Sequence, residues 1–454
     1  MAEKVVIIGG TAAGLSAASK AKRLNPGLEI RVFEKSGYIS YGACGLPYFV
    51  GGLIEEPERL ISLTVEQMRE KRDIPAYTHH EVIKISREEK KVLVKNLDDG
   101  TVNWHAYDKL VIATGARPIK PDIEGIDAKG IHYLRTVEDG IRLKHTLLEA
   151  EGESKSVIAG GGFIGLETAA EIAGTGTEVT LLESGSRLLP FLEESFSQQL
   201  LDTLRDHGVR VLLGEALERI ESENGYAAAA VTDKGKALKA DLILISAGVR
   251  PNTELAEEAG IELGVRKAIR VTDYMETSDP SIWACGDCAE ARHIITGKPV
   301  YIPLGTTANK QGRTAGDNLA GRRESFAGVL GSVVTKVFDQ YIACTGLTGE
   351  QAEEEGYEVE SVSITKADKA SYYPGAGENR IRLLFDRITG KLLGAQAMGS
   401  ESVAGRINVL AAAITAGMTV EEVSQLDLVY APPVAPVYDP ILIAASQAVK
   451  KVKK

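Results

Sequence analysis

The chain has 454 residues, which is too long for one ordinary hydrophobic core, so two or three domains of roughly 100 to 200 residues are expected. Apolar residues make up 44% and charged residues 25%, an ordinary mixture for a soluble protein. The formal net charge is −11 with both signs interspersed, which makes nucleic acid and anionic membrane surfaces poor partners.

Targeting and membrane signals are the next class to consider. The N-terminus runs directly into an apolar strand and a glycine turn, without the basic and apolar regions of a signal peptide. The longest weakly polar run, Asn408 to Met418, is far shorter than the roughly 20 residues that a membrane span requires, and we interpret it as a buried helix. Four cysteines in so long a chain fit reduced thiols rather than a disulfide scaffold. We therefore expect a cytoplasmic protein, and we expect no metal site.

The first motif is a strand, glycine turn, helix and second strand at the N-terminus. These elements are predicted at Lys4–Ile8, Gly9-Gly10-Thr11-Ala12-Ala13-Gly14, Leu15–Leu24 and Glu29–Phe33. Glycine lets the backbone approach a pyrophosphate, which then lies on the helix N-terminus. Glu34 ends the second strand, where a carboxylate can accept the hydroxyls of an adenosine ribose. Thr11 occupies the middle glycine position of the strict pattern.

A second unit of the same kind begins about 150 residues later. Its elements are predicted at Ser156–Ala159, Gly160-Gly161-Gly162-Phe163-Ile164-Gly165 and Glu178–Leu182, followed by Glu183. Here the glycine pattern is intact. Two such units indicate two dinucleotides, the arrangement needed when a hydride from nicotinamide must reach a second redox cofactor.

Three further segments each join an apolar strand to a glycine loop: Lys109–Ala116, Leu242–Asn252 and Ser281–Asp287. With the two glycine turns, they resemble the flavoprotein disulfide reductase family along nearly the whole chain. The resemblance implies an α/β fold with two Rossmann-like dinucleotide-binding domains and a C-terminal α+β dimerisation domain. It implies a discontinuous FAD domain at 1–118 and 246–327, an NAD(P)H domain at 119–245 and an interface domain at 328–454.

The motifs and the resemblance together assign the cofactor-binding residues. These are Gly9, Gly10, Ala12, Ala13, Gly14, Glu34, Lys35, Val82, Ala113, Thr114, Gly115, Gly286, Asp287, Gly160, Gly162, Phe163, Ile164, Gly165, Glu167, Glu183 and Gly248. In the family, Thr114 and Gly115 lie where the chain crosses between domains, and the Asp287 position holds the flavin ribitol. The negative charge of Glu183 favours NADH over NADPH, although Ser184 and Arg187 follow closely and could soften that preference.

Cys44 is the candidate redox thiol, within the segment Ser40 to Tyr48. Glutathione reductase relatives carry a second cysteine five positions after the first, whereas this chain has Phe49 there. Cys44 must then cycle through an external sulfur or an oxygen species. We predict that it lies in the first turn of a short helix with Pro47 just inside, where exposed N–H groups and the helix dipole favour the thiolate. The alternative is a small buried apolar cysteine.

Histidine placement narrows the chemistry. The last histidine is His293, so the C-terminal histidine of dithiol reductases is missing, and Ala12 stands where single-cysteine peroxidases and oxidases carry theirs. Another proton donor is required. Segments Ser371–Ala376 and Leu428–Pro433 resemble coenzyme A disulfide reductases, in which two tyrosines of the partner subunit reach the active-site cysteine. This implies that role for Tyr372 and Tyr430; the alternative is simple packing at a subunit interface.

The same branch includes the NADH-dependent persulfide reductases, which often continue into a rhodanese domain; we expect no such domain here. Several coenzyme A disulfide reductases have Asn where this chain has Ala43. Lys20 and Arg23 lie where the family meets the phosphates of coenzyme A (CoA), and Ser40 borders that site; the alternative is solvated helix residues. Cys285 and Cys288 form a C-x-x-C, which we interpret as non-redox because it overlaps the Asp expected to hold the flavin.

The sequence therefore predicts a homodimer in which NADH passes a hydride to FAD, which reduces sulfur bound to Cys44. CoA disulfide, CoA persulfide and polysulfide are the expected acceptors. A first alternative is an NADH oxidase that reduces oxygen to water or peroxide. A second is a redox-responsive interaction protein that binds dinucleotides without fast turnover.

Overall fold

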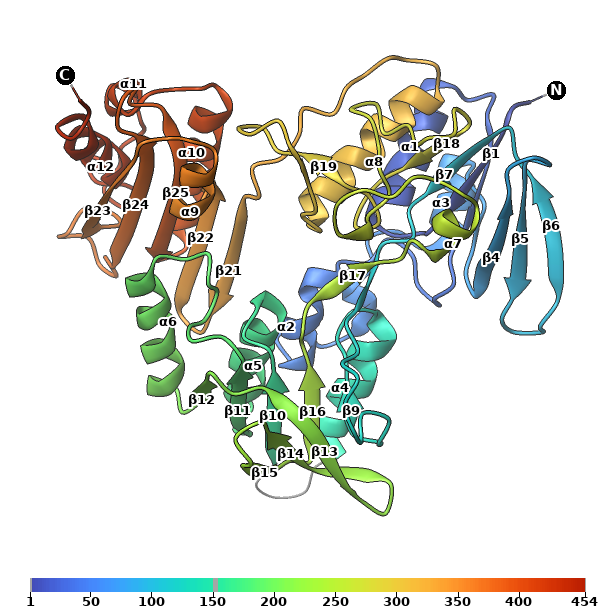
Figure 1. Cartoon of the computed structure of the whole chain (residues 1–454), viewed down its shortest axis with the longest axis horizontal. Coiled ribbons are helices and arrows are strands. Elements are labelled where there is room, and N and C mark those ends of the chain that lie inside the picture. The colour runs from blue at the N-terminus through green and yellow to red at the C-terminus, as the bar shows by residue number, and fades with distance from the viewer. Residues whose placement is uncertain (1, 150–153, 454) are drawn as a thin grey trace.

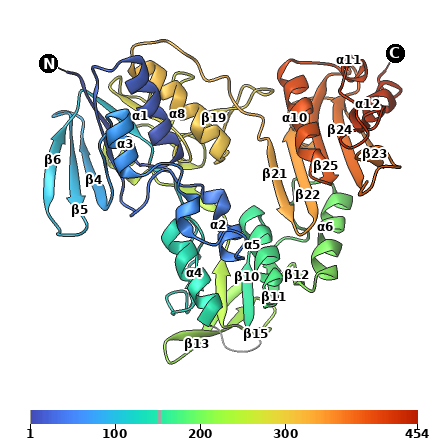
Figure 2. The ribbon, with the colours of Figure 1, turned by 180° about the vertical axis from the view of Figure 1, so that it is seen from behind.

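The computed structural model describes residues 2–149 and 154–453. Three sheet-based units make up this part of the chain (Figure 1). The first nucleotide-binding unit and the C-terminal domain lie on opposite sides, and the second nucleotide-binding unit lies below and between them (Figures 1 and 2). Among the residues with described positions, no helix is both long and apolar enough to cross a membrane.

The first unit is built on a five-stranded parallel sheet of order β18-β7-β1-β2-β3. Its strands are β1 (Lys4–Ile8), β2 (Glu29–Phe33), β3 (Ala76–Tyr77), β7 (Lys109–Ile112) and β18 (Ile282–Ala284). These strands are almost wholly apolar because both faces of the sheet are covered. Helices α1 (Ala12–Leu24) and α8 (Gly305–Leu319) lie side by side on one face. They pack so closely that a Cβ on Gly312 would lie 2.3 Å from the Ala13 carbonyl oxygen.

The other face of this sheet is covered by a three-stranded antiparallel sheet and a short helix. Their bounds are β4 (His80–Ser86), β5 (Lys91–Asn96), β6 (Val102–Ala106) and α7 (Glu254–Glu258). Smaller elements complete the unit: the 3-10 turns at Ala43–Gly45, Pro57–Leu60 and Val265–Lys267, helices α2 (Leu46–Val50) and α3 (Val65–Arg72), and strands β19 (Ala291–Arg292) and β20 (Pro299–Val300).

The second unit repeats the plan with a parallel sheet of order β12-β11-β10-β16-β9. Its strands are β9 (Ile131–His132), β10 (Lys155–Ala159), β11 (Glu178–Glu183), β12 (Arg210–Leu213) and β16 (Leu242–Ile245). Its helices are α4 (Val137–Glu149), α5 (Phe163–Gly174) and α6 (Glu194–Asp206), and an antiparallel sheet covers the other face with β13 (Leu217–Glu223), β14 (Tyr226–Thr232) and β15 (Ala237–Lys239). The chain crosses between the units twice, where β8 (Ala116–Pro118) pairs antiparallel with β17 (Val249–Pro251).

The C-terminal domain is an antiparallel sheet of order β21-β22-β25-β24-β23 with helices on one face. Its elements are β21 (Val333–Val337), β22 (Gln340–Gly346), α9 (Gly349–Glu354), β23 (Val359–Ala367), β24 (Glu378–Asp386), β25 (Leu392–Gly399), α10 (Ser402–Thr415), α11 (Val420–Ser424) and α12 (Pro440–Val449). The sheet docks on the second unit, where Gln396 accepts from the Glu193 amide at 2.9 Å and donates to the Phe191 carbonyl at 2.9 Å. The predicted α/β class with two Rossmann-like units and a C-terminal α+β domain is confirmed.

Candidate active site

Both glycine turns are shaped by close backbone contacts that leave no space for a side chain. Gly9 has φ +108°, and a Cβ there would lie 2.1 Å from the Ala113 carbonyl oxygen. Gly14, in the first turn of α1, lies so close to Gly9 that a Cβ on it would lie 2.0 Å from the Gly9 carbonyl oxygen. Only glycine tolerates such a φ together with such contacts. The turn therefore brings the N-terminus of α1 against the ends of β1 and β7.

The second turn reproduces this arrangement. Gly160 has φ +119° and a Cβ there would lie 2.2 Å from the Ser246 carbonyl oxygen, while a Cβ on Gly165 would lie 1.9 Å from the Gly160 carbonyl oxygen. The end of each second strand also repeats: Gly10 donates its amide to Glu34 at 2.7 Å, and Gly161 donates to Glu183 at 2.8 Å. Phe163 and Ile164 form the first turn of α5.

Thr11 departs from the glycine pattern at a position where the backbone does not require glycine. Its φ is −106°, and the equivalent Gly162 has φ −80° with no atom within 4 Å of an added Cβ. Glycine at this position serves the approach of a pyrophosphate rather than the fold of the free chain. The threonine is thus compatible with the turn.

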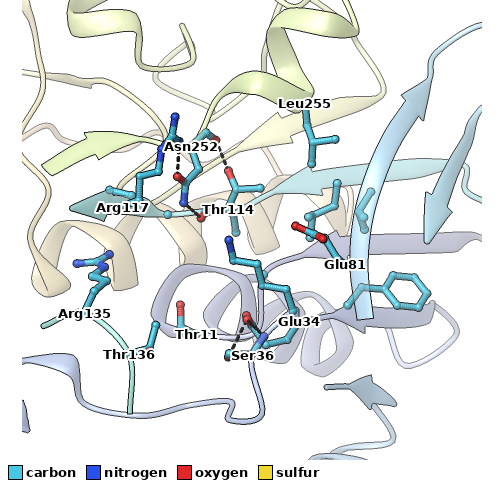
Figure 3. A pocket seen from close by; sticks show the side chains of 18 of the residues that line it. Thr11, Glu34, Ser36, Glu81, Thr114, Arg117, Arg135, Thr136, Asn252 and Leu255 are labelled. Carbon is cyan, nitrogen blue, oxygen red and sulfur yellow. Dashed lines mark hydrogen bonds between the residues drawn. The ribbon is translucent and has the colours of Figure 1, made fainter. Parts of the chain in front are cut away.

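A cavity of about 520 Å³ opens at the first turn (Figure 3). Its wall combines the glycine turn, the end of β2, the start of β4 and the crossing between units; among the residues expected to bind cofactor, it includes Gly9, Glu34, Lys35, Val82, Ala113, Thr114 and Gly115. Gly10, Ala12, Ala13 and Gly14 belong to the same turn and the first turn of α1. A cavity lined by a carboxylate at the end of β2 and by the glycine turn before a helix fits a dinucleotide.

The Glu34 carboxylate is held rigidly at this cavity. It is buried, with 8% of its surface exposed, and accepts from the Ser36 amide at 2.9 Å and the Ser36 hydroxyl at 2.8 Å as well as from Gly10. Figure 3 shows Glu34 and Ser36 side by side. Glu183 is held in the same way by the amides of Gly161 and Gly185. Arg187 instead donates to the Pro190 carbonyl at 2.7 Å, so its guanidinium is engaged elsewhere.

The crossing between the units closes the cavity. Thr114 donates its hydroxyl to the Asn252 carbonyl at 2.6 Å, and the Asn252 amide group donates to the Thr114 carbonyl at 2.8 Å (Figure 3). Gly115 and Gly248 both have positive φ at this crossing, and Gly248 accepts from the Ile119 amide at 2.9 Å. The sequence motif located Thr114 and Gly115, but nothing in the sequence pointed to Asn252 as their partner.

Asp287 lies after β18 and forms an ion pair with Arg135 at 2.7 Å. Gly286, just before it, has φ +83° and donates its amide to Gln311 at 2.8 Å. Arg135 precedes α4 and carries no motif, so the sequence analysis missed it. The ion pair nevertheless joins the segment before α4 to the expected flavin-binding loop.

Cys44 lies in the 3-10 turn Ala43–Gly45, which leads directly into α2 with Pro47 in its first turn, as predicted. It is the exposed cysteine of the four, whereas Cys285 and Cys288 are buried and Cys344 is half-buried. The predicted stabilisation of the thiolate by backbone N–H groups is present but is outweighed. Reduced hydration by the surrounding protein, and then the charge of Glu167, raise the pKa of Cys44 above its usual value. The backbone hydrogen bond that favours the thiolate is a smaller effect than either of these.

Known proteins share this sequence pattern and this fold. Residues 3–312 match the family described as pyridine nucleotide-disulphide oxidoreductase, and residues 333–440 match the dimerisation domain of that family. The chain belongs to the pyridine nucleotide-disulphide oxidoreductase family. Members use FAD and NAD(P)H, and this chain is an oxidoreductase of that kind.

Relatives within this family span nearly the whole chain. An NAD(P)H coenzyme A polysulfide/persulfide reductase of Pyrococcus horikoshii is 39% identical, with 98% of each chain covered. An NADH oxidase of Methanocaldococcus jannaschii is 37% identical, with 99% of each covered. The structure of an NAD-dependent persulfide reductase from A. fulgidus superposes with a TM-score of 0.94 at 40% identity, and the match covers 99% of this chain and 83% of that one.

The two expected family tyrosines lie together on the C-terminal domain. Tyr372 is 75% exposed and Tyr430 is 47% exposed, and a hydrogen bond with Tyr372 is the main cause that raises the pKa of Tyr430. Their loops are tied together, because the Ala370 amide donates to the Pro432 carbonyl at 3.2 Å. Arg406 is buried and contacts a residue near each loop in the sequence. It donates to the Asp368 carbonyl at 2.8 Å and forms an ion pair with Asp439 at 2.9 Å.

The three residues expected to bind CoA lie in different environments. Lys20 is half-buried on α1 and forms an ion pair with Asp317 of α8 at 3.3 Å, so part of its charge is compensated. Arg23 is exposed on the same helix. Ser40 has φ +51° and its amide donates to the Gly10 carbonyl at 2.9 Å, which fixes the start of the cysteine segment to the glycine turn. Their roles in binding stay predictions.

Glu167, predicted to bind the nicotinamide cofactor, lies on α5 and accepts a hydrogen bond from Thr335 of β21 at 2.7 Å. The structure therefore connects this carboxylate to the C-terminal domain, a contact that the sequence did not indicate. Burial raises the pKa of the Glu167 carboxyl. Cys285 and Cys288 are buried free thiols, and the non-redox interpretation of the C-x-x-C stays a prediction.

The glycine turns provide a paired test. Replacement of Gly160 by Ala places a Cβ 2.2 Å from the Ser246 carbonyl at φ +119°, whereas Gly162→Ala meets no atom within 4 Å. We expect G160A to lower the stability of the second unit by about 2 to 4 kcal/mol and G162A to change it by less than about 1 kcal/mol. Chemical unfolding followed by circular dichroism measures both, and equal midpoints for the two variants would contradict the described turn.

Proposed function

We propose that this chain is a cytoplasmic, homodimeric flavoprotein that uses NADH to reduce CoA disulfide, CoA persulfide or polysulfide at Cys44. The observation that carries this proposal is the exposed Cys44. It comes after the first glycine turn in the sequence, and its own segment has no second cysteine. Phe49 takes the place of that second cysteine and is buried in α2. An external sulfur is then needed to complete each cycle.

We further propose that the two dinucleotide-binding sites and Cys44 form one active centre. FAD occupies the domain of residues 1–118 and 246–327, NADH the domain 119–245, and the interface domain 328–454 supplies the partner contacts. The exposed tyrosines support the dimer, because exposed apolar residues cluster around them: Tyr373, Val429, Val434, Val437 and Tyr438. A patch of this kind marks a surface that is covered in the assembly.

FAD, when bound, supplies the transfer of an electron pair from NADH to sulfur. Cys44 attacks one sulfur of CoA disulfide, so the sulfur–sulfur bond breaks, the first CoA leaves as a thiolate and a mixed disulfide forms at Cys44. The electron pair from NADH then releases the second CoA, and two protons convert both products to thiols. With a CoA persulfide, the same attack leaves CoA as a thiol and a persulfide on Cys44, from which the electron pair releases sulfide.

Proton supply is assigned to Tyr372 and Tyr430 of the partner subunit. A tyrosine phenol with the ordinary pKa of about 10 is neutral at working pH, and the hydrogen bond with Tyr372 raises the pKa of Tyr430 further. A neutral phenol can donate a proton or a hydrogen bond to a departing thiolate. Lys20, Arg23 and Ser40 are proposed to bind the CoA moiety.

The NADH oxidase alternative has its own support, because one relative of nearly full length carries that name. The oxidase and the reductase activities need the same two dinucleotide-binding sites, so they differ in the acceptor that reaches Cys44. Oxygen consumption with NADH alone, set against turnover with CoA disulfide, separates them. The binding-only alternative is separated by stopped-flow reduction of the flavin, where a rate below about 0.1 per second lies outside the ordinary enzyme range.

Replacement of Cys44 by Ser tests the proposed chemistry. We expect the variant to keep its FAD and the reduction of that FAD by NADH, because the contacts of the two dinucleotide-binding sites do not depend on the thiol. Turnover of CoA disulfide should fall by at least about a thousandfold. Steady-state assays and flavin absorbance measure these. Cys344→Ser is the matched control and should keep full activity, since this half-buried thiol lies in β22. Turnover retained by C44S would reject the proposal.

The tyrosines are tested by removing only their hydroxyls. Tyr372→Phe and Tyr430→Phe should each lower turnover of CoA disulfide by about tenfold, and the double variant by about a hundredfold or more. Reduction of the flavin by NADH should stay unchanged, which stopped-flow absorbance measures separately. Tyr373→Phe is the matched control from the same loop. If the control has the same effect, or flavin reduction slows equally, the tyrosines are not proton donors.

The preference for NADH is tested at Glu183. Its carboxylate is fixed by two backbone amides and would repel a 2′-phosphate. We expect the catalytic efficiency of the parent with NADH to exceed that with NADPH about tenfold. Glu183→Ala should lower this ratio of the two efficiencies. Initial rates with both nucleotides decide this. An efficiency at least tenfold higher with NADPH in the parent would overturn the assignment.

A further inference from the structure

The two exposed tyrosines lie on loops of the C-terminal domain, so their positions depend on how those loops are held. Tyr372 lies in the loop between β23 and β24, and Tyr430 lies in the loop between α11 and α12. A phenol that donates a proton must lie within hydrogen-bond reach of its acceptor, and a shift of about 1 Å can slow the reaction strongly. The ends of the two loops therefore decide where the hydroxyls lie.

The first loop is closed by buried Asp368. Its carboxylate accepts from the Gly377 amide at 2.9 Å, and its own amide donates to the Gly377 carbonyl at 2.9 Å. The two ends of the loop that carries Tyr372 are thus bonded to each other. Because Ala370 in this loop donates its amide to the Pro432 carbonyl, the second loop follows the position of the first.

Arg406 of α10 bonds the ends of both loops. Its buried guanidinium donates through Nη2 to the Asp368 carbonyl at 2.8 Å and to the Asp439 carboxylate at 2.9 Å, and through Nε to the same carboxylate at 3.1 Å. Asp439 is also buried, and it accepts from the Ile441 amide at 2.9 Å, where the second loop ends and α12 begins. One side chain therefore joins the loops of both tyrosines.

A buried ion pair is a costly way to stabilise a domain. The desolvation of both charges offsets much of their attraction, so apolar residues of the same volume often stabilise a protein equally well. A guanidinium differs from other cations because its planar fork fixes two partners at set angles. Here the fork of Arg406 meets two segments that are far apart in the sequence and that each end a tyrosine loop.

We propose that Arg406 is a positioning residue for Tyr372 and Tyr430, through its bonds to Asp368 and Asp439. The role of Arg406 rests on the proposed function, in which these tyrosines supply protons to the departing thiolate. Without the fork, the two loops would move independently, and the hydroxyls would meet the thiolate less often in the productive geometry. Electron transfer from NADH to the flavin uses neither loop, so its rate would not change.

The experiment is a double-mutant cycle with the FAD-bound enzyme. Arg406→Lys keeps the charge and removes the fork, and kcat for CoA disulfide is measured for this substitution in the parent and in the Tyr372→Phe/Tyr430→Phe variant. We expect kcat to fall about tenfold in the parent and less than about twofold in the double Phe variant, whose hydroxyls are already missing. The rate of flavin reduction by NADH, followed by stopped-flow absorbance, should stay within about twofold. A fall in that rate equal to the fall in kcat overturns the proposal.

A second pair of variants tests the loop end if R406K does not fold. Asp368→Ala opens the first loop at the point that Arg406 bonds, and kcat should again fall about tenfold in the parent but not in the double Phe variant. Asp386→Ala is the matched control: this carboxylate is also buried and accepts from the Thr389 amide at 3.1 Å, at the opposite end of β24 from the first loop. It should keep kcat within about twofold of the parent. Equal values of kcat for D368A and D386A overturn the proposal.

The double Phe variant separates this role from the proposed function. If it turns over CoA disulfide as fast as the parent, the tyrosines are not proton donors, and the proposed proton supply fails. If it is slow and R406K lowers kcat equally in both backgrounds, the proton supply stands, and the positioning role of Arg406 is overturned.

Discussion

The thiol of Cys44 has no second sulfur in its own segment, because Phe49 stands five residues further along and is buried in α2. An electron pair that reaches this sulfur must therefore leave through an external acceptor. The rest of the fold supplies what such a thiol needs. Two glycine turns place two dinucleotides, the paired segments β8 and β17 join them, and a short helix presents the cysteine.

The charges around that sulfur act against its ionisation in the free chain. Burial and Glu167 raise the pKa of Cys44, and the ion pair of Arg135 with Asp287 contributes effects that oppose each other. Arg135 and the local backbone hydrogen bond lower the pKa of Cys44, but their effects are smaller than that of burial.

Much of the fold could be predicted because the strongest signals are local. The strands Lys4–Ile8 and Glu29–Phe33 occur at the predicted bounds, and the glycine turns follow from backbone contacts that exclude any side chain. The exposed position of Cys44 and the start of its helix also follow from local sequence. The helix after the first turn begins at Ala12, earlier than the predicted Leu15, because alanines in its first turn carry no periodic apolar signal.

Contacts between distant segments could not be predicted in the same way. Asn252 meets Thr114, Arg135 meets Asp287 and Thr335 meets Glu167, and the members of each pair are more than 100 residues apart, so no single motif contains both. Burial is the largest cause that raises the pKa of Cys44, and the charge of Glu167, from a segment distant in the sequence, comes next, so together they outweigh the local backbone hydrogen bond that lowers this pKa. Local sequence gives the position of a reactive group, whereas its electrostatic environment comes from segments that only the fold brings together.

The central claim is that the sulfur of Cys44 lies against the flavin. Its most direct test is the absorbance spectrum of the FAD-bound enzyme, titrated anaerobically to the two-electron-reduced state. A thiolate in contact with oxidised flavin gives a long-wavelength charge-transfer band. We expect this band in the parent and its complete loss in Cys44→Ser at equal flavin content; a band that persists in the variant, or a parent without one at any pH, would contradict the claim.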